Sequence, residues 1–208
     1  VNGIDIQMVK KIIITGGLGY IGTEICKIYS GYSWHHKITV IDNRFISERV
    51  NQIRNWNMEF IHGDILDKEL VNKHFSDADI VHHLAGITDV PRTKSESAVE
   101  KDEKIKLVGE KGTQNILDVI SDKCKIIFPS THVIYEGIEK VKNDIKEHEE
   151  SRPVLSYSLS KAFNEKQLKD SGKNYVILRL GSVYGYSTDT TRIDIMPNLF
   201  SKIASQNG

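Results

Sequence analysis

Three glycines at regular spacing stand where a short apolar run gives way to helical sequence. Gly16, Gly19 and Gly22 follow Ile12–Thr15, a run typical of a buried strand. A turn without side chains lets a ligand approach the backbone, and the N–H groups and dipole of the following helix favour a pyrophosphate. Asp42 ends the next strand pattern and can accept hydrogen bonds from ribose hydroxyls. This pattern predicts a dinucleotide-binding site.

The acidic side chain of Asp42 also bears on which dinucleotide binds. A carboxylate at that position would repel the 2′-phosphate of NADP, so we predict NAD as the cofactor. Arg44 follows two residues later, and a guanidinium there can accommodate such a phosphate. NADP therefore remains the less favoured alternative.

A tyrosine and a lysine are spaced for proton transfer. Tyr157 and Lys161 lie four residues apart at the start of a predicted helix, so they share one face. A phenol has an ordinary pKa of about 10 and is a poor base at neutral pH, whereas a nearby ammonium favours the phenolate. The same spacing also occurs as a plain surface pair. Its place after a fifth strand of a dinucleotide-binding pattern favours an acid/base role.

The elements that must position these residues alternate along the chain. Helical patterns at about residues 20–31, 67–76, 96–121 and 156–171 separate short β-branched runs. Those runs are Ile12–Thr15, Ile38–Ile41, Met58–Ile61, Ile80–Leu84, Lys125–Phe128 and Tyr175–Leu178. Their nearly continuous apolar character suits strands covered on both faces. The alternation predicts βαβ units and a doubly wound parallel sheet, the Rossmann-type α/β fold.

Several short motifs occur in a fixed order between about Lys10 and the end of the chain. They are Thr15–Gly22, Gly63-Asp64-Ile65, His83–Gly86, Gly112–Asn115, Ser130-Thr131 through Tyr135, Tyr157–Lys161 and Arg179–Gly185. In this order they resemble the extended short-chain dehydrogenase/reductases. In particular, the sequence is similar to the NAD-dependent epimerase/dehydratase family, which acts on nucleotide sugars.

The resemblance implies a role for each matching residue. Thr131 would hydrogen-bond the reacting hydroxyl or carbonyl, Tyr157 would be the acid/base, and Lys161 would hold the nicotinamide ribose while lowering the Tyr157 pKa. The nicotinamide would do the redox chemistry. The residues expected to contact the cofactor are Gly16, Gly19, Tyr20, Ile21, Gly22, Asp42, Asn43, Asp64, Ile65, Leu84, Ala85, Gly86, Tyr157, Lys161, Ser182 and Val183.

The sequence departs from the family pattern at several positions. Gly109 and Ser182 stand where the family usually has asparagine, and Glu136 stands where it usually has glycine. His132 and Val133 follow Thr131, where dehydratases often carry an acidic pair. Epimerisation or simple carbonyl reduction is therefore favoured over dehydration.

The resemblance implies an NAD-dependent oxidoreductase or epimerase acting on a nucleotide-activated sugar, with tyrosine acid/base catalysis and hydride transfer. An NAD(P)-dependent carbonyl reductase or a dehydratase of the same family is one alternative. A dinucleotide-binding sensor or scaffold without turnover is another. Because a sensor needs only the glycine turn and Asp42, the presence of Thr131, Tyr157 and Lys161 favours the enzyme.

Composition excludes some classes of partner. The 208 residues carry 28 Lys+Arg and 28 Asp+Glu, and this balance argues against nucleic acid or an anionic membrane as the main partner. No apolar run approaches the roughly 18 residues that a membrane span requires. Cys26 and Cys124 lie far apart without metal-ligand spacing, so we expect two buried thiols in a reducing cytoplasm and no metal.

The sequence also suggests how the chain divides. Residues 1–7 read as a tag or non-native leader before Met8, residues 8–185 as the NAD-binding domain, and residues 186–208 as the beginning of a smaller, incomplete substrate-binding domain. We therefore expect a longer natural protein, and a 208-residue chain that binds cofactor but turns over poorly. By resemblance, the helices near 96–121 and 156–171 would form a homodimer through a four-helix bundle.

Overall fold

The structure is a computed structural model that describes residues 9–88, 99–189, 192–193 and 195–207, so the predicted leader lies outside it. The strands are β1 (Lys11–Thr15), β2 (Lys37–Asp42), β3 (Glu59–His62), β4 (Ile80–His83), β5 (Lys125–Thr131) and β6 (Asn174–Leu180). The helices are α1 (Tyr20–Ser30), α2 (Ser47–Asn55), α3 (Lys68–Phe75), α4 (Val99–Lys106), α5 (Gly112–Val119), α6 (Ser156–Asp170) and α7 (Met196–Asn207).

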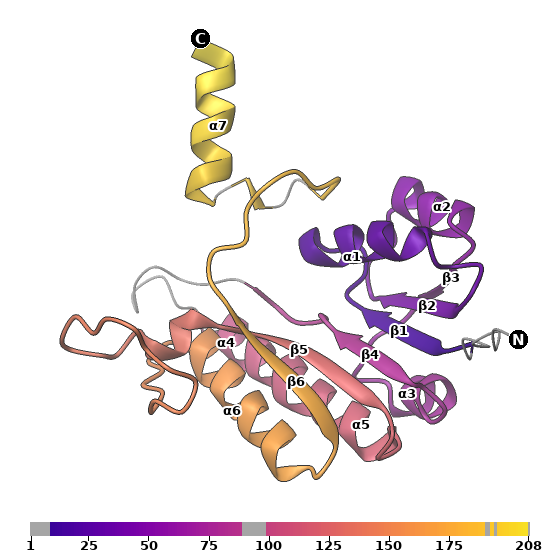
Figure 1. The fold of residues 1–208 in the computed structure, drawn as a ribbon, viewed down its shortest axis with the longest axis horizontal. Coiled ribbons are helices and arrows are strands. Elements are labelled where there is room, and N and C mark those ends of the chain that lie inside the picture. Colours follow the sequence, from indigo (N-terminus) through magenta and orange to yellow (C-terminus); the bar gives the residue numbers. More distant parts are fainter. Residues whose placement is uncertain (1–8, 89–98, 190–191, 194, 208) are drawn as a thin grey trace, which may run out of the picture.

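The six strands form one parallel sheet in the order β3-β2-β1-β4-β5-β6 (Figure 1). The order reverses between β1 and β4, where Ile13 lies opposite Val81 on one side and Thr39 on the other. In doubly wound sheets a ligand crevice forms beyond the carboxyl ends of the strands at this reversal. The predicted Rossmann-type fold is confirmed.

Alternate residues of β1 face two separate hydrophobic clusters. Ile13 packs in a cluster with Phe75 of α3, Ile116 of α5 and Leu168 of α6. Ile12 and Ile14 belong to the other cluster, which includes Cys26 of α1 and Val50 of α2. Because side chains alternate along a strand, helices cover both faces of the central sheet. This explains the nearly continuous apolar runs in the sequence.

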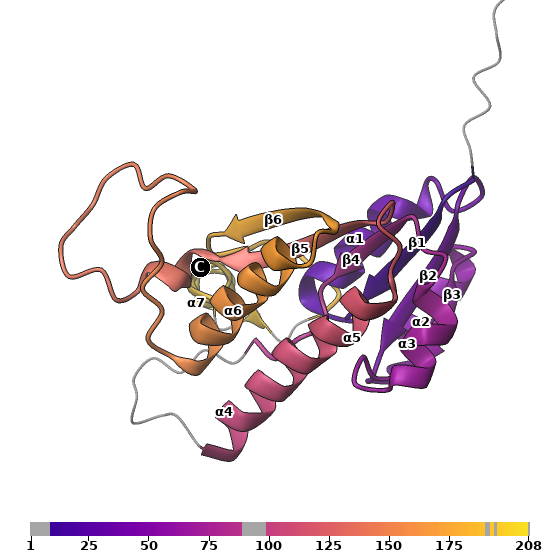
Figure 2. The same ribbon diagram turned by 90° about the horizontal axis from the view of Figure 1, so that it is seen from below.

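The prediction of strands covered on both faces is wrong at the β6 edge. Val176 and Leu178 pair with Ile127 and Pro129 of β5, on the face that carries α1 and α2. Their side chains are 37% and 43% exposed, and no helix among the described residues packs over them (Figure 2). Helical cover of this face therefore ends before β6.

All four predicted helical patterns contain helices, but one is interrupted, and α2 and α7 lie outside the predicted ranges. The pattern at 96–121 is not one α-helix, because a π-helical turn at Leu107–Lys111 separates α4 from α5, although the two continue along one line (Figure 2). Its residues 96–98 lie outside the described residues. The helix α2 was not predicted, because only Val50 and Ile53 of its nine residues are buried and its pattern is short. No described helix has the length and apolar content to cross a membrane.

Candidate functional site

A cavity of about 740 Å³ opens where the strand order reverses, a volume within the usual range for small-molecule sites. Every residue predicted to contact the cofactor or to act in catalysis lines it. One side comes from the turns after β1, β2 and β3, and the other from β5, α6 and the segment after β6. The structure therefore brings the glycine turn and the Tyr157–Lys161 pair to one cavity.

The glycine turn packs too closely for side chains and leaves the start of α1 uncapped. Gly16 has a φ of +67°, and a Cβ there would lie 2.8 Å from the Ala85 nitrogen. A Cβ on Gly22 would lie 2.3 Å from the Gly16 oxygen. No side chain caps α1 at Gly19, and its first turn holds no acidic residue. Its first N–H groups and positive dipole end therefore suit a pyrophosphate, so the residues present fit a dinucleotide.

Asp42 lines the cavity with most of its hydrogen-bonding capacity already used. Its Oδ2 accepts from the Leu18 N–H at 2.9 Å, and its Oδ1 accepts from the Arg44 N–H at 2.9 Å and from Arg44 Nε at 3.4 Å. A carboxylate offers about four acceptor positions. Asp42, only 5% exposed, is therefore fixed in place with capacity left for a ribose hydroxyl.

The turns after β2 and β3 are joined at the neighbouring end of the cavity. Asn43 Nδ2 donates to Asp64 Oδ2 at 3.0 Å, and Asp64 Oδ1 accepts from the Leu66 N–H at 2.9 Å. The Asn43 carbonyl oxygen lies 3.0 Å from His62 Nε2. These bonds hold the Asp64 carboxylate beside the cavity, where the family resemblance expects the adenine.

A buried histidine supports the turn after β4. The Ala85 N–H donates to Thr15 Oγ1 at 3.0 Å, and His83 lies 3.1 Å from that oxygen through Nδ1 and 2.9 Å from Thr113 Oγ1 through Nε2. Burial lowers the pKa of His83 to about 3, so the ring is neutral at physiological pH. The arrangement fixes the backbone of Ala85 against Gly16.

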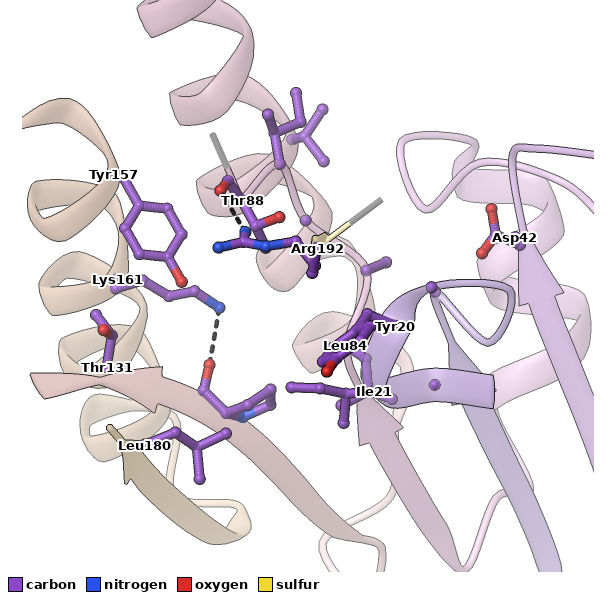
Figure 3. Close-up of a pocket in the computed structure, with 18 of the residues that line it drawn as sticks. Tyr20, Ile21, Asp42, Leu84, Thr88, Thr131, Tyr157, Lys161, Leu180 and Arg192 are labelled. Atoms are coloured by element: carbon purple, nitrogen blue, oxygen red, sulfur yellow. Dashed lines mark hydrogen bonds between the residues drawn. The ribbon is translucent and has the colours of Figure 1, made fainter. Parts of the chain in front are cut away.

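Tyr157 and Lys161 project from the first turns of α6 into the cavity (Figure 3). Lys161 Nζ donates to the Pro129 carbonyl at 2.8 Å and lies 5.9 Å from the centroid of the Tyr157 ring. Burial lowers the pKa of Lys161 to about 8.

The pKa of Tyr157 shifts in the direction opposite to the predicted one. Burial raises the pKa of the phenol, while the positive charge of Arg192 acts to lower it. The predicted net lowering is wrong for this structure, because the loss of hydration outweighs the favourable charge of Arg192. Tyr157 therefore keeps its proton near neutral pH.

Thr131 stands at the junction between β5 and a 3₁₀ turn (His132–Tyr135). Its Oγ1 accepts from the Val133 N–H at 3.2 Å, and the residue is 6% exposed. The neighbouring Ser130 points away from this junction to Glu165 Oε1, at 2.6 Å. Both residues line the cavity, but the Ser130 hydroxyl is engaged by Glu165, so Thr131 is the candidate hydroxyl for the site it shares with Tyr157 (Figure 3).

Glu136, which departs from the family pattern, has a structural function. One carboxylate oxygen, Oε1, accepts from the Val154 N–H at 2.7 Å, from the Leu155 N–H at 2.6 Å and from the Ser158 hydroxyl. These donors lie at the start of α6. Glu136 therefore fixes the end of the helix that carries Tyr157.

The glycine at position 109 also has a structural explanation. A Cβ on Gly109 would lie 2.3 Å from Ser160 Oγ, so the serine occupies the space that a side chain would need. Asn164 Nδ2 donates to the Gly109 carbonyl at 3.1 Å. The π-helical turn is thus tied to α6 by groups on α6 instead of by an asparagine at 109.

The cavity residues that the sequence analysis missed include Asp189 and Arg192. Arg192 Nη1 donates to the Thr88 carbonyl at 3.1 Å (Figure 3), and Asp189 is 1% exposed. Both follow β6 in a segment without periodicity, so no local signal marks them. Across the described parts of the chain, no group of three or more His, Cys, Asp or Glu side chains is arranged to hold a metal ion.

Comparison with known proteins agrees with the geometry. Residues 12–207 match the NAD dependent epimerase/dehydratase family. A putative UDP-glucose 4-epimerase of Methanocaldococcus jannaschii is 31% identical over 186 residues, covering 86% of this chain and 57% of that protein. A dTDP-D-glucose 4,6-dehydratase of Dictyostelium discoideum is 28% identical over 205 residues, covering 88% and 46%. The chain spans about half the length of the curated relatives it matches.

Solved structures show the same likeness. A UDP-N-acetylglucosamine 4-epimerase from Methanobrevibacter ruminantium, in complex with UDP-N-acetylmuramic acid, superposes with a TM-score of 0.75 at 27% identity, covering 95% of this chain and 64% of that one. The UDP-glucose 4-epimerase from Brucella ovis, in complex with NAD, superposes with a TM-score of 0.70 at 28% identity, covering 86% and 54%. The order of the motifs, the parallel sheet and the family match together show that this chain belongs to the NAD-dependent epimerase/dehydratase family.

Proposed function

We propose that this chain binds NAD and carries the proton-transfer residues of a nucleotide-sugar epimerase. The observation that supports this most directly is the single cavity that contains both the glycine turn with Asp42 and the side chains of Thr131, Tyr157 and Lys161. A binding module needs only the first set. The second set gives the cavity a proton donor and acceptor beside a cation.

Different residues of the chain would bind the cofactor and transfer the proton. Bound NAD supplies the hydride acceptor, while the protein binds, orients and moves protons. The N-terminus of α1 would hold the pyrophosphate, and Asp42 would hold the adenosine ribose. Lys161 would hold the nicotinamide ribose beside Tyr157. Once its own proton has passed to solvent, Tyr157 Oη would take the proton of a sugar hydroxyl and return it after the opposite face has been reduced.

The nucleotide part of the substrate is inferred from charge and from the relatives. Arg192 places a guanidinium beside the Tyr157 end of the cavity, and guanidinium groups suit diphosphates. The structural relatives include a 4-epimerase in complex with a UDP sugar. A nucleoside-diphosphate sugar is therefore the substrate class that we propose.

A second candidate function is carbonyl reduction, and the Tyr157 pKa favours it. Because burial raises that pKa, the phenol retains the proton that a new alcohol requires. The two functions differ in cofactor balance: an epimerase regenerates its NAD, whereas a reductase consumes one NADH for each product. Following NADH absorbance during turnover of a keto sugar nucleotide distinguishes them.

The same resemblance supports a dimer through α4 and α6. Leu159 and Phe163 of α6 are 49% and 44% exposed, and α4 packs beside α6. We infer that these side chains contact a second copy of the chain in a four-helix bundle. Sedimentation equilibrium of the wild type and of Phe163→Glu gives the test, with a monomer expected for the variant.

Tyr157→Phe is the decisive substitution for the enzymatic proposal. It removes only the phenolic oxygen, so turnover should fall by at least about a thousandfold, within the range of general acid/base catalysis. NAD affinity, measured by calorimetric titration, should change by less than about threefold because the ring and Lys161 remain. Unchanged turnover would exclude Tyr157 as the acid/base.

Tyr175→Phe is the matched control, because Tyr175 lies on β6, does not line the cavity and is 37% exposed. Its turnover should equal that of the wild type. If the wild-type chain binds NAD without turnover on any nucleotide sugar, the same titration still tests the cofactor site. Absence of NAD binding would overturn the proposal itself.

A further inference from the structure

The segment after β6 returns over the end of the cavity at which Asp42 lies. Ser187 Oγ donates to the Tyr20 carbonyl at 2.9 Å, and Arg49 Nη2 donates to the Thr188 carbonyl at 3.2 Å. Arg49 Nη1 also donates to the Leu18 carbonyl at 2.5 Å. These contacts fix residues 187–189 against the glycine turn and the start of α2, far in sequence from β6.

Asp189 is thereby placed between two guanidinium groups. Its Oδ2 lies 3.3 Å from Arg49 Nη1 and 3.6 Å from Arg44 Nη1. The side chain of Asp189 is 1% exposed, whereas that of Arg44 is 43% exposed. Arg44 is also 3.4 Å from Asp42 through Nε. Two carboxylates and two guanidiniums thus form a cluster that carries no net charge.

The cluster occupies the place that distinguishes the two nicotinamide dinucleotides. NADP differs from NAD by a phosphate on the 2′ oxygen of the adenosine ribose, and sites that accept it use an arginine near the end of the second strand. Arg44 is such an arginine and lines the cavity together with Asp42 and Asp189. Its positive charge is already matched by the two carboxylates.

Building on the proposed NAD site, we propose that Asp189 is a specificity residue that excludes NADP. Asp189 forms ion pairs with Arg44 and Arg49. Neither guanidinium is then available to neutralise the charge of a 2′-phosphate. Asp42 alone would leave one positive charge uncompensated, because a single carboxylate paired with Arg44 cannot balance two guanidiniums. With Asp189 present a 2′-phosphate meets a neutral cluster, and without its charge the phosphate would meet a cluster with one excess positive charge.

The test is a titration of the 208-residue chain and its variants with NAD and with NADP. Asp189→Asn keeps the size of the side chain and removes its charge, so NADP should bind at least about tenfold more tightly, as a freed guanidinium–phosphate contact allows. NAD affinity should change by less than about threefold. The gain for NADP should shrink at high salt, because the contact is ionic.

Two further variants separate this role from simple anchoring of the segment. Arg49→Gln leaves the cluster with a net negative charge, so the preference for NAD should increase, opposite to Asp189→Asn. Loss of anchoring alone would change NAD and NADP affinity alike in both variants. In Asp189→Asn/Arg44→Leu the gain for NADP should disappear, because the freed guanidinium is gone.

Asp122→Asn is the control for overall charge, because Asp122 pairs with Lys173, and the two residues precede β5 and β6 at the strand ends opposite the cavity. It should leave the ratio of NADP to NAD affinity unchanged. An unchanged ratio in Asp189→Asn, with NAD still bound, would overturn this inference but not the proposed function. If Asp189→Asn does not fold, an unchanged ratio in Arg49→Gln overturns it equally. A wild type that binds neither dinucleotide would overturn both.

Discussion

At the scale of single residues, His83 links the stability of the fold to the shape of the site. Its ring bonds to Thr15 on one side and Thr113 on the other, and Thr15 in turn holds the Ala85 N–H. A protonated ring would need an acceptor at both nitrogens and would carry an unhydrated charge. The neutral ring is therefore part of the folded state, and its protonation opposes folding.

This gives a pH dependence with a definite sign. The pKa of His83 is about 3 in the folded protein against an ordinary value of 6.5, so the unfolded chain takes up the proton first as the pH falls. The neutral His83 ring contributes fully to the free energy of unfolding above pH 6.5. This contribution falls towards lower pH by up to about 1.4 kcal/mol per pH unit. Urea unfolding of the wild type and of His83→Gln between pH 7 and 5 measures it.

His83→Gln should show a flatter decline with falling pH, and a lower stability at pH 7 by about 1–3 kcal/mol because the amide cannot replace both bonds. His148→Gln is the control, since that histidine is exposed in the loop before α6. Its pH dependence should match that of the wild type. A slope in His83→Gln equal to the wild-type slope would contradict the assignment.

At the scale of elements, α6 is held at its start by a residue outside the helix. The N-cap residue, Leu155, makes no side-chain capping hydrogen bond. Glu136, 19 residues away, accepts from the Leu155 N–H instead. A carboxylate at a helix N-terminus is favoured by the dipole as well. The position of Tyr157 therefore depends on Glu136.

Glu136→Ala should destabilise the fold by about 1–3 kcal/mol, because it leaves the Leu155 N–H without its acceptor and the Val154 N–H with only the longer bond to Ser158 Oγ. Glu136→Gln keeps one acceptor oxygen and should lie between Glu136→Ala and the wild type. Chemical denaturation followed by circular dichroism measures the difference. Glu139→Ala, at an exposed position of the same loop, should unfold at the wild-type midpoint. If Glu136→Ala and Glu136→Gln also unfold at that midpoint, Glu136 does not fix the start of α6.

The elements show which features sequence can predict. The glycine turn, the strands and the Tyr157–Lys161 spacing depend on neighbouring residues, and each was predicted within a few positions. The role of Glu136 was not predicted, because its partners at 154, 155 and 158 meet it only after the loop folds back. The π-helical turn at 107–111 was missed for a similar reason, since Asn164 of α6 bonds the Gly109 carbonyl from 55 residues away.

At the scale of the whole molecule, the segment after β6 is fastened to the glycine turn (Figure 1). Tyr20 Oη donates to the Gly185 carbonyl at 2.5 Å and accepts from Asn198 Nδ2 at 2.9 Å. Asn198 Oδ1 also accepts from the Gly185 N–H at 2.9 Å. The long separation of these residues in sequence explains why Tyr20 was predicted to contact the cofactor but not this segment.

Tyr20→Phe should remove the hydrogen bonds to Gly185 and Asn198 while keeping the aromatic ring in the cavity. Hydrogen exchange in peptides covering 185–189 and 195–207 should accelerate about fivefold or more, as expected for the loss of hydrogen bonds worth about 1 kcal/mol or more. Mass spectrometry after deuterium labelling measures it. Tyr32→Phe alters an exposed tyrosine after α1 and serves as the control. Identical exchange in Tyr20→Phe and the wild type would show that other contacts hold the segment.

The junction of β1 with β4 has a consequence for the order of events during synthesis. Residues 11–62 form β1 to β3, and residues 80–180 form β4 to β6, so each half of the sheet is continuous along the chain. A ribosome delivers the glycine turn and Asp42 well before Tyr157 and Lys161, and chains begin to fold from the N-terminus as they emerge. Under the proposed function, the nascent first half would present the pyrophosphate site but would lack the wall that is to enclose the nicotinamide. Full capture of the cofactor must therefore wait until β5 and α6 have left the ribosome and packed beside β4.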